Sequence, residues 1–141
     1  MNLYADTSAL LKLFLPEPGS EEMRRLYETA GRIACASIGY VEIHAGLAMA
    51  QRTGRLTDMQ YSRQVAEVSS TWPSIAQLPV ERLLSIAADY ASRYALRAYD
   101  AVHLAALDGF AAPVEATFVC WDKDLRDAAA RLGYELLPLS L

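Results

Sequence analysis

The sequence predicts an α/β protein, a three-layer α/β/α domain whose central, mainly parallel sheet has about four to five short strands. Short apolar runs typical of buried strands alternate with longer segments of helical pattern, which favours a parallel sheet covered on both faces. Acidic residues also directly follow two of these runs, where ligands bind in such sheets. The 141 residues show no internal repeat or linker, so we expect a single domain over 1–141.

In the N-terminal part, each expected element has its own signal. The apolar run 3–5 predicts a buried strand, and the helix expected at 8–15 is closed by prolines and a glycine. Ser20 is expected to cap a helix over 20–30, whose first turn carries two glutamates that favour the helix dipole. After a glycine that stops this helix, a second strand is expected at 33–36.

Helices dominate the middle of the chain. Ser37 is expected to cap a third helix that ends near a glycine, and Thr57 a fourth that ends before a Trp-Pro pair. The segment 75–78 is ambiguous and could form a short strand. Two alanine-rich helices are expected at 80–94 and 98–110.

The C-terminal part returns to alternation. A strand is expected at 117–120, a helix ended by a glycine at 123–132, and a last strand at 134–137. Cys35 and Cys120 fall inside expected strands without metal-ligand spacing, so we expect two buried free thiols.

The bulk properties limit the classes of function. The apolar stretches are too short and too interrupted to span a bilayer, and no leader sequence opens the chain, so we expect a cytoplasmic protein that does not interact with membranes. The net charge of −4 argues against a broadly basic nucleic-acid-binding surface. It does not exclude a nucleic-acid enzyme, because acids that bind a metal are neutralised in use.

Four carboxylates stand out by their positions. Asp6 and Asp122 directly follow apolar runs, so both should project into the crevice beyond the strand ends. Glu42 and Asp100 lie in early turns of their expected helices and can reach the same edge. The four acids are therefore expected at one rim of one sheet.

Each acid also has an ordinary explanation. Asp6 and Asp122 could cap the helices that follow them, and Asp100 could simply favour a helix N-terminus. Glu42 could lie on a solvated helix face. None of these explanations requires the four acids to share an edge.

A cluster of carboxylates at one edge would suit a magnesium site. Mg²⁺ takes oxygen ligands and usually keeps several waters, while carboxylates clustered without a metal repel one another. A bound ion can deprotonate a water and stabilise the leaving oxygen of a phosphodiester. Such a cluster would therefore support metal-dependent hydrolysis of a nucleic acid.

The chain resembles PIN-domain ribonucleases, specifically the VapC toxins of type II toxin–antitoxin pairs. The resemblance covers nearly the whole chain and rests on DTSAL at 6–10, Glu42, YDAVHLA at 99–105, and Asp122 followed by Leu125. It implies a PIN fold and an endoribonuclease that uses Mg²⁺ or Mn²⁺ and inhibits growth or translation. It also implies an RNA substrate, a homodimer and a cognate antitoxin protein that blocks the site.

The resemblance maps the family's metal-binding acids onto four positions of this chain, namely Asp6, Glu42, Asp100 and Asp122. The family often has a serine or threonine two residues before the fourth acid, where this chain has Cys120. That departure puts one supporting hydrogen bond in doubt and leaves the metal site intact.

Several neighbours of the acids keep two interpretations. Thr7 and Ser8 either hydrogen-bond to the site or cap a helix, and Arg97 either holds a substrate phosphate or pairs with a carboxylate. Asp124 is either an auxiliary acid or, the interpretation we favour, a solvated residue at a helix start. His103, His44 and Trp121 are expected in packed or hydrogen-bonded core positions rather than as metal ligands or a base platform.

Two other classes of protein remain as alternatives. A phosphatase of the haloacid dehalogenase type also has an Asp after its first strand, but a second Asp would replace Ser8. A non-catalytic module, either a receiver domain or an inactive PIN-like relative, is the other. A receiver would need a mid-chain strand-end Asp, and an inactive relative would have lost an acid.

Overall fold

A five-stranded, all-parallel sheet forms the middle layer of the molecule, in the order β3-β2-β1-β4-β5. The computed structural model describes residues 1–141. The strands are β1 Asn2–Ala5, β2 Arg32–Ala36, β3 Ala76–Leu78, β4 Thr117–Val119 and β5 Leu136–Leu137. The expected parallel sheet is thus confirmed, and the ambiguous segment 75–78 contributes its edge strand β3.

Seven α-helices and three short 3₁₀ turns surround the sheet. The α-helices are α1 Thr7–Leu10, α2 Ser20–Thr29, α3 Gly39–Arg52, α4 Asp58–Thr71, α5 Leu84–Arg93, α6 Ala98–Ala111 and α7 Lys123–Arg131. The 3₁₀ turns are η1 Leu11–Leu13, η2 Trp72–Ser74 and η3 Val80–Arg82. No helix is long and apolar enough to cross a membrane.

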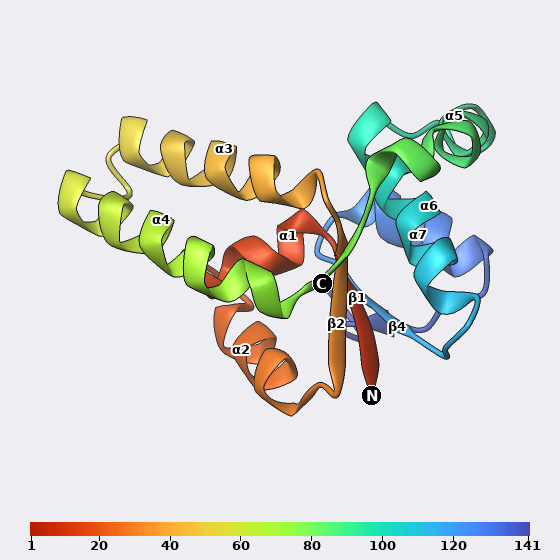
Figure 1. Cartoon of the computed structure of the whole chain (residues 1–141), viewed down its shortest axis with the longest axis horizontal. Helices are drawn as coiled ribbons and strands as arrows, with labels where there is room; N and C mark the ends of the chain where they lie inside the picture. The colour runs from red at the N-terminus through yellow and green to blue at the C-terminus, as the bar shows by residue number, and fades with distance from the viewer.

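The helices divide between the two faces of the sheet, with α1 to α4 on one side and α5 to α7 on the other (Figure 1). Alternate strand residues point to opposite faces. In β1, Leu3 and Ala5 belong to the core under α1 to α4, whereas Tyr4 belongs to the core under α5 to α7. Both faces are buried, which explains why the strands read as continuous apolar runs.

Two expected helices are shorter than predicted because their hydrogen bonding tightens. The segment expected as one helix at 8–15 forms α1 followed by η1, and the segment expected at 80–94 forms η3 followed by α5. Leu10, Phe14 and Leu15 are nevertheless buried. The apolar pattern therefore predicted which side chains enter the core, although not the type of turn.

The capping prediction holds at Thr57 and fails at two serines. Thr57 forms a capping box with Gln60 at the start of α4. Ser20 is already inside α2, whose N-cap is Gly19, and its hydroxyl donates to the Leu15 carbonyl at 2.8 Å. The serine hydroxyl is thus used to hold the preceding loop.

Ser37 likewise does not cap α3, which begins at Gly39 with Ile38 as its N-cap. Its hydroxyl instead accepts a hydrogen bond from the Val80 amide at 3.3 Å, across 43 residues of chain. A Cβ atom at Gly39 would lie 2.6 Å from Cys35 Sγ. The first turn of α3 is therefore seated directly against β2, which brings Glu42 close to the end of that strand.

Candidate active site at the carboxyl edge of the sheet

The four acids predicted from the sequence lie around the carboxyl edge of the sheet. Asp6 directly follows β1, and Asp122 follows β4 as the N-cap of α7. Glu42 lies in the first turn of α3, just beyond β2, and Asp100 lies in the first turn of α6. Because all strands are parallel, their carboxyl ends share this edge.

Asp6 is a buried carboxyl, only 4% exposed. Its Oδ1 accepts hydrogen bonds from the Ser8 hydroxyl at 2.7 Å and from the Ala9 amide at 3.0 Å. Burial raises the pKa of Asp6, although the charge of His103 and the bonds from Ser8 and Ala9 act in the opposite direction. The capping interpretation is thus correct, but the cap is a buried acid without a cation in contact.

Glu42 is held by two side chains from other elements. Its Oε1 lies 2.6 Å from His103 Nε2 and accepts a hydrogen bond from Thr7 Oγ1 at 2.8 Å. Burial would raise the pKa of Glu42, but His103 and Thr7 outweigh it and the pKa is lowered. Glu42 is therefore an oriented carboxylate and not part of a solvated helix face.

His103 is itself fixed by a residue that sequence reasoning missed. The His103 ring is buried, and its Nδ1 lies 2.9 Å from the hydroxyl of Tyr4 on β1. That hydroxyl accepts the Ala36 amide of β2 at 3.1 Å. The expectation of a hydrogen-bonded core histidine is confirmed. A fully buried tyrosine in a strand was the available signal, since its hydroxyl needs a partner.

Arg97 forms salt bridges with the other two acids, Asp100 and Asp122. Its Nε lies 3.0 Å from Asp100 Oδ2, and its Nη2 lies 3.4 Å from Asp122 Oδ2. Burial and the charge of Asp122 raise the pKa of Asp100 despite the contact with Arg97. Of the two interpretations of Arg97, the structure shows carboxylate pairing.

The acids thus share an edge without converging on one point. No three His, Cys, Asp or Glu side chains form a group that could hold a metal ion as they stand. A cavity of about 390 Å³ at this edge is lined by Glu42, Arg97, Ala98, Tyr99 and Asp100. Carboxylate oxygens suit a hard divalent cation, and Asp6 is a buried carboxyl with no cation in contact. The chemistry of the residue set therefore fits Mg²⁺ or Mn²⁺.

Comparison with known proteins identifies the family. A family model of the PIN domain matches residues 3–131. The chain belongs to the PIN-domain family. The ribonucleases VapC45 and VapC49, from two Mycobacterium tuberculosis strains, are each 31% identical to it over 142 residues, covering 99% of this chain and 96% of the relative. Family membership sets aside the phosphatase and receiver-domain alternatives.

Solved structures share the fold of this PIN domain at low sequence identity. VapC20 of M. tuberculosis, described as a Sarcin-Ricin loop cleaving toxin, aligns with a TM-score of 0.66 at 17% identity, over 89% of this chain and 94% of that one. FitAcB of Neisseria gonorrhoeae aligns with a TM-score of 0.64 at 16% identity, over 96% of each chain. A toxin–antitoxin complex from Klebsiella pneumoniae gives a TM-score of 0.62 at 16% identity, over 86% of this chain and 88% of that one.

Thr7 and Ser8 both support acids in this PIN domain. Thr7 bonds to Glu42, while Ser8 bonds to Asp6 and also accepts the Trp121 amide at 2.9 Å. Cys120 Sγ accepts the Asp122 amide at 3.3 Å. The thiol therefore supplies an acceptor beside the fourth acid. Cys35 and Cys120 are both buried and free, as expected.

The aromatic neighbours are packing residues, as predicted. Trp121 packs so closely on Gly19, whose φ is +91°, that a Cβ there would lie 2.8 Å from the indole ring. The Lys12 ammonium lies 4.9 Å from the centre of that ring. His44 packs edge-on against Tyr40 at 4.5 Å, with its buried Nε2 unpaired. Asp124 is exposed in the first turn of α7, which agrees with a helix-start role.

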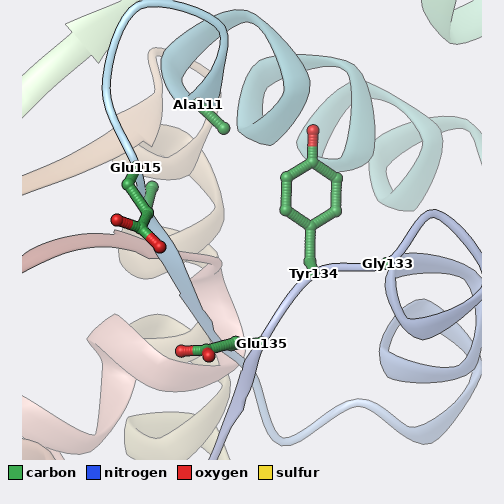
Figure 2. A pocket seen from close by; sticks show the side chains of 6 residues that line it. Ala111, Glu115, Gly133, Tyr134 and Glu135 are labelled. Carbon is green, nitrogen blue, oxygen red and sulfur yellow. The ribbon is translucent and has the colours of Figure 1, made fainter.

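A second cavity, of about 340 Å³, lies at the opposite edge of the sheet, where the segments leading into β4 and β5 meet (Figure 2). Glu115 and Glu135 line it on one side and Tyr134 on the other. The Tyr134 hydroxyl donates to Asp108, which also accepts from Tyr90 at 2.7 Å. None of the four acids lines this cavity, so it is separate from the candidate active site.

Proposed function

We propose that this PIN domain is a ribonuclease of the VapC type, which hydrolyses RNA phosphodiester bonds with the help of Mg²⁺ or Mn²⁺. The observation that carries the proposal is the set of four acids around one edge of the sheet, one of which, Asp6, is buried with no cation in contact. Relatives named as ribonucleases match 99% of the chain. A metal-binding nuclease site at this edge accounts for both the cluster of acids and the similarity to ribonucleases.

In this proposal, the residues that would hold the metal are Asp6, Glu42, Asp100 and Asp122. The bound ion would supply an activated water and would stabilise negative charge at the phosphate. The neighbouring side chains of this chain hold the acids in position. Thr7 and His103 both hold Oε1 of the Glu42 carboxylate, and Ser8 fixes the rotation of Asp6. Orientation of ligands by such partners is a major part of metal affinity.

We further propose that the chain works as the toxin of a toxin–antitoxin pair and forms a homodimer. The solved structure from Klebsiella pneumoniae that shares the fold is described as a toxin–antitoxin complex. A net charge of −4 and an acidic edge suit a basic segment of a partner protein. A small gene immediately upstream that encodes a DNA-binding protein would support the antitoxin assignment. Co-expression with its product and measurement of the mass of the purified complex would test both assignments.

The cleavage test uses the purified full chain and a mixed RNA pool, with Mg²⁺, Mn²⁺ or a chelator. We expect cleavage only with metal, and at least about a hundredfold loss in Asp6→Asn and Asp100→Asn, because each substitution removes a charged oxygen ligand. Asp89→Asn is the matched control, since Asp89 pairs with Arg93 on the exposed side of α5. Equal cleavage by all variants would indicate a contaminating nuclease and contradict the assignment.

A further inference from the structure

Arg97 occupies a position that the proposed metal would need. It is the only cation of the chain in salt-bridge contact with either Asp100 or Asp122, and it contacts both. We propose that Arg97 is a built-in competitor of the metal, which bridges these two acids in the metal-free protein and gives them up when the ion binds. This inference rests on the proposed function of the site.

The atoms involved support direct competition. On Asp122, Oδ1 accepts the Leu125 amide at 3.0 Å as the N-cap of α7, whereas Oδ2 accepts no backbone amide. Arg97 Nη2 donates a hydrogen bond to Oδ2 of Asp122, and Arg97 Nε donates one to Oδ2 of Asp100. A cation that bound both acids through these Oδ2 atoms would have to replace the guanidinium. A planar guanidinium can reach two carboxylates at once, which an ammonium does poorly.

The position of Arg97 in the chain makes it easy to displace. Arg97 is the N-cap of α6, with an extended backbone (φ −64°, ψ 157°), so its side chain leaves the helix at the first turn beside Asp100. The side chain is 79% exposed and makes no other hydrogen bond. Exposed ion pairs of this kind are weak, because water and salt replace them readily. The bridge therefore lowers metal affinity modestly and does not block the site.

The opposite role for Arg97 predicts the opposite change in affinity. If Arg97 instead positioned Asp100 for the metal, its removal would loosen a ligand and weaken binding. If it competes, its removal frees two oxygens, takes away a repelling charge and strengthens binding. The direction of the change in metal affinity thus decides between the two roles.

The experiment measures Mn²⁺ binding to the full chain by calorimetry and by the metal-induced rise in melting temperature. It compares wild type with Arg97→Gln, Arg97→Lys and the control Arg93→Gln, which removes an exposed Arg–Asp pair within α5. We expect Arg97→Gln to bind Mn²⁺ about two- to fivefold more tightly, the equivalent of a weak exposed ion pair. Arg97→Lys should fall between wild type and Arg97→Gln, and Arg93→Gln should match wild type.

Three results would overturn the inference in distinguishable ways. If wild type binds Mn²⁺ and Arg97→Gln binds it equally or more weakly, the competitor role is wrong while the metal site stands. If Arg97→Lys equals wild type, the charge alone acts and the two-carboxylate bridge is wrong. If neither wild type nor Arg97→Gln binds Mn²⁺, the proposed metal site fails and the inference fails with it.

Discussion

At the scale of single residues, the acids differ in how their charge is compensated. Glu42 has His103 and Thr7, and Asp100 and Asp122 share Arg97. Asp6 has hydrogen bonds but no cation in contact, and burial raises its pKa. An acid kept in this condition costs stability in the metal-free protein, as expected for a group selected for binding rather than for folding.

We therefore predict that Asp6→Asn stabilises the metal-free protein at neutral pH, by about 1 kcal/mol, because it removes a buried charge. Asparagine caps a helix as well as aspartate does, and its oxygen can still accept the bonds from Ser8 and Ala9. Unfolding in urea at pH 7 would measure the gain, with Asp89→Asn as the control. A loss of stability in Asp6→Asn would contradict the prediction.

The gain in Asp6→Asn should depend on pH. The pKa of Asp6 is raised in the native state above its ordinary value of 3.8, so the unfolded chain releases this proton first. The stability that the protonated carboxyl contributes is fully present below about pH 3.8 and is lost as the pH rises through the native pKa. The difference between variant and wild type should shrink as the pH falls toward 4, and a constant difference would exclude this cause.

The placement of Asp6 and Asp122 could be predicted because a strand followed by an acid is a local pattern. The support of Glu42 by His103 could not be predicted, since His103 lies 61 residues further along the chain. Sequence reasoning assigned His103 to the core, but nothing local links it to Tyr4 or Glu42. Contacts of this kind follow from how α6 crosses β1 and β2, which no single segment encodes.

At the scale of elements, the start of α3 is the tightest junction near the site. Gly39 lies between Cys35 on β2 and Trp72 in η2, and a Cβ atom there would be 2.6 Å and 3.3 Å from their nearest atoms. The sequence predicted only that Ser37 caps a helix here. Local polar residues suggest caps, but only the packed structure shows which partners Ser20 and Ser37 reach.

We predict that Gly39→Ala costs about 1–3 kcal/mol of stability, because the added methyl group must push α3 away from β2. Moving α3 would also displace Glu42 and weaken Mn²⁺ binding. Gly109→Ala in α6 is the matched control. Its Cβ would meet only ordinary contacts at 3.6 Å, so it should be neutral or slightly stabilising. Thermal unfolding of both variants measures the contrast, and equal melting temperatures would contradict it.

At the scale of the whole molecule, the fold gathers negative charge at one edge of a sheet in a chain that is already acidic. The alternation of short strands and helices was enough to predict this arrangement of layers. The conformation of the acids was not predictable in the same way. The sequence led us to expect them at one rim, which is where they lie. The pairing of Asp100 with Asp122 through Arg97, and the support of Glu42 by Thr7 and His103, depend on contacts between elements.

We predict that millimolar Mn²⁺ raises the melting temperature of the wild-type protein, because an ion that binds only the native state stabilises it. At a concentration a hundredfold above the dissociation constant, the gain is about 2.7 kcal/mol. The rise should be smaller in Asp100→Asn, which lacks one ligand charge. Differential scanning fluorimetry measures both, and no rise at concentrations that support RNA cleavage would contradict a preformed site.

The strand order also bears on how the protein is made. β1 is synthesised before the other four strands of the sheet, yet it lies in the centre of the sheet between β2 and β4. Its second neighbour is not synthesised until residues 117–119, and the fourth acid follows at Asp122. A nascent chain that stops earlier has neither the complete five-stranded sheet nor the complete acidic edge. An activity that needs all four acids therefore requires synthesis to reach at least Asp122.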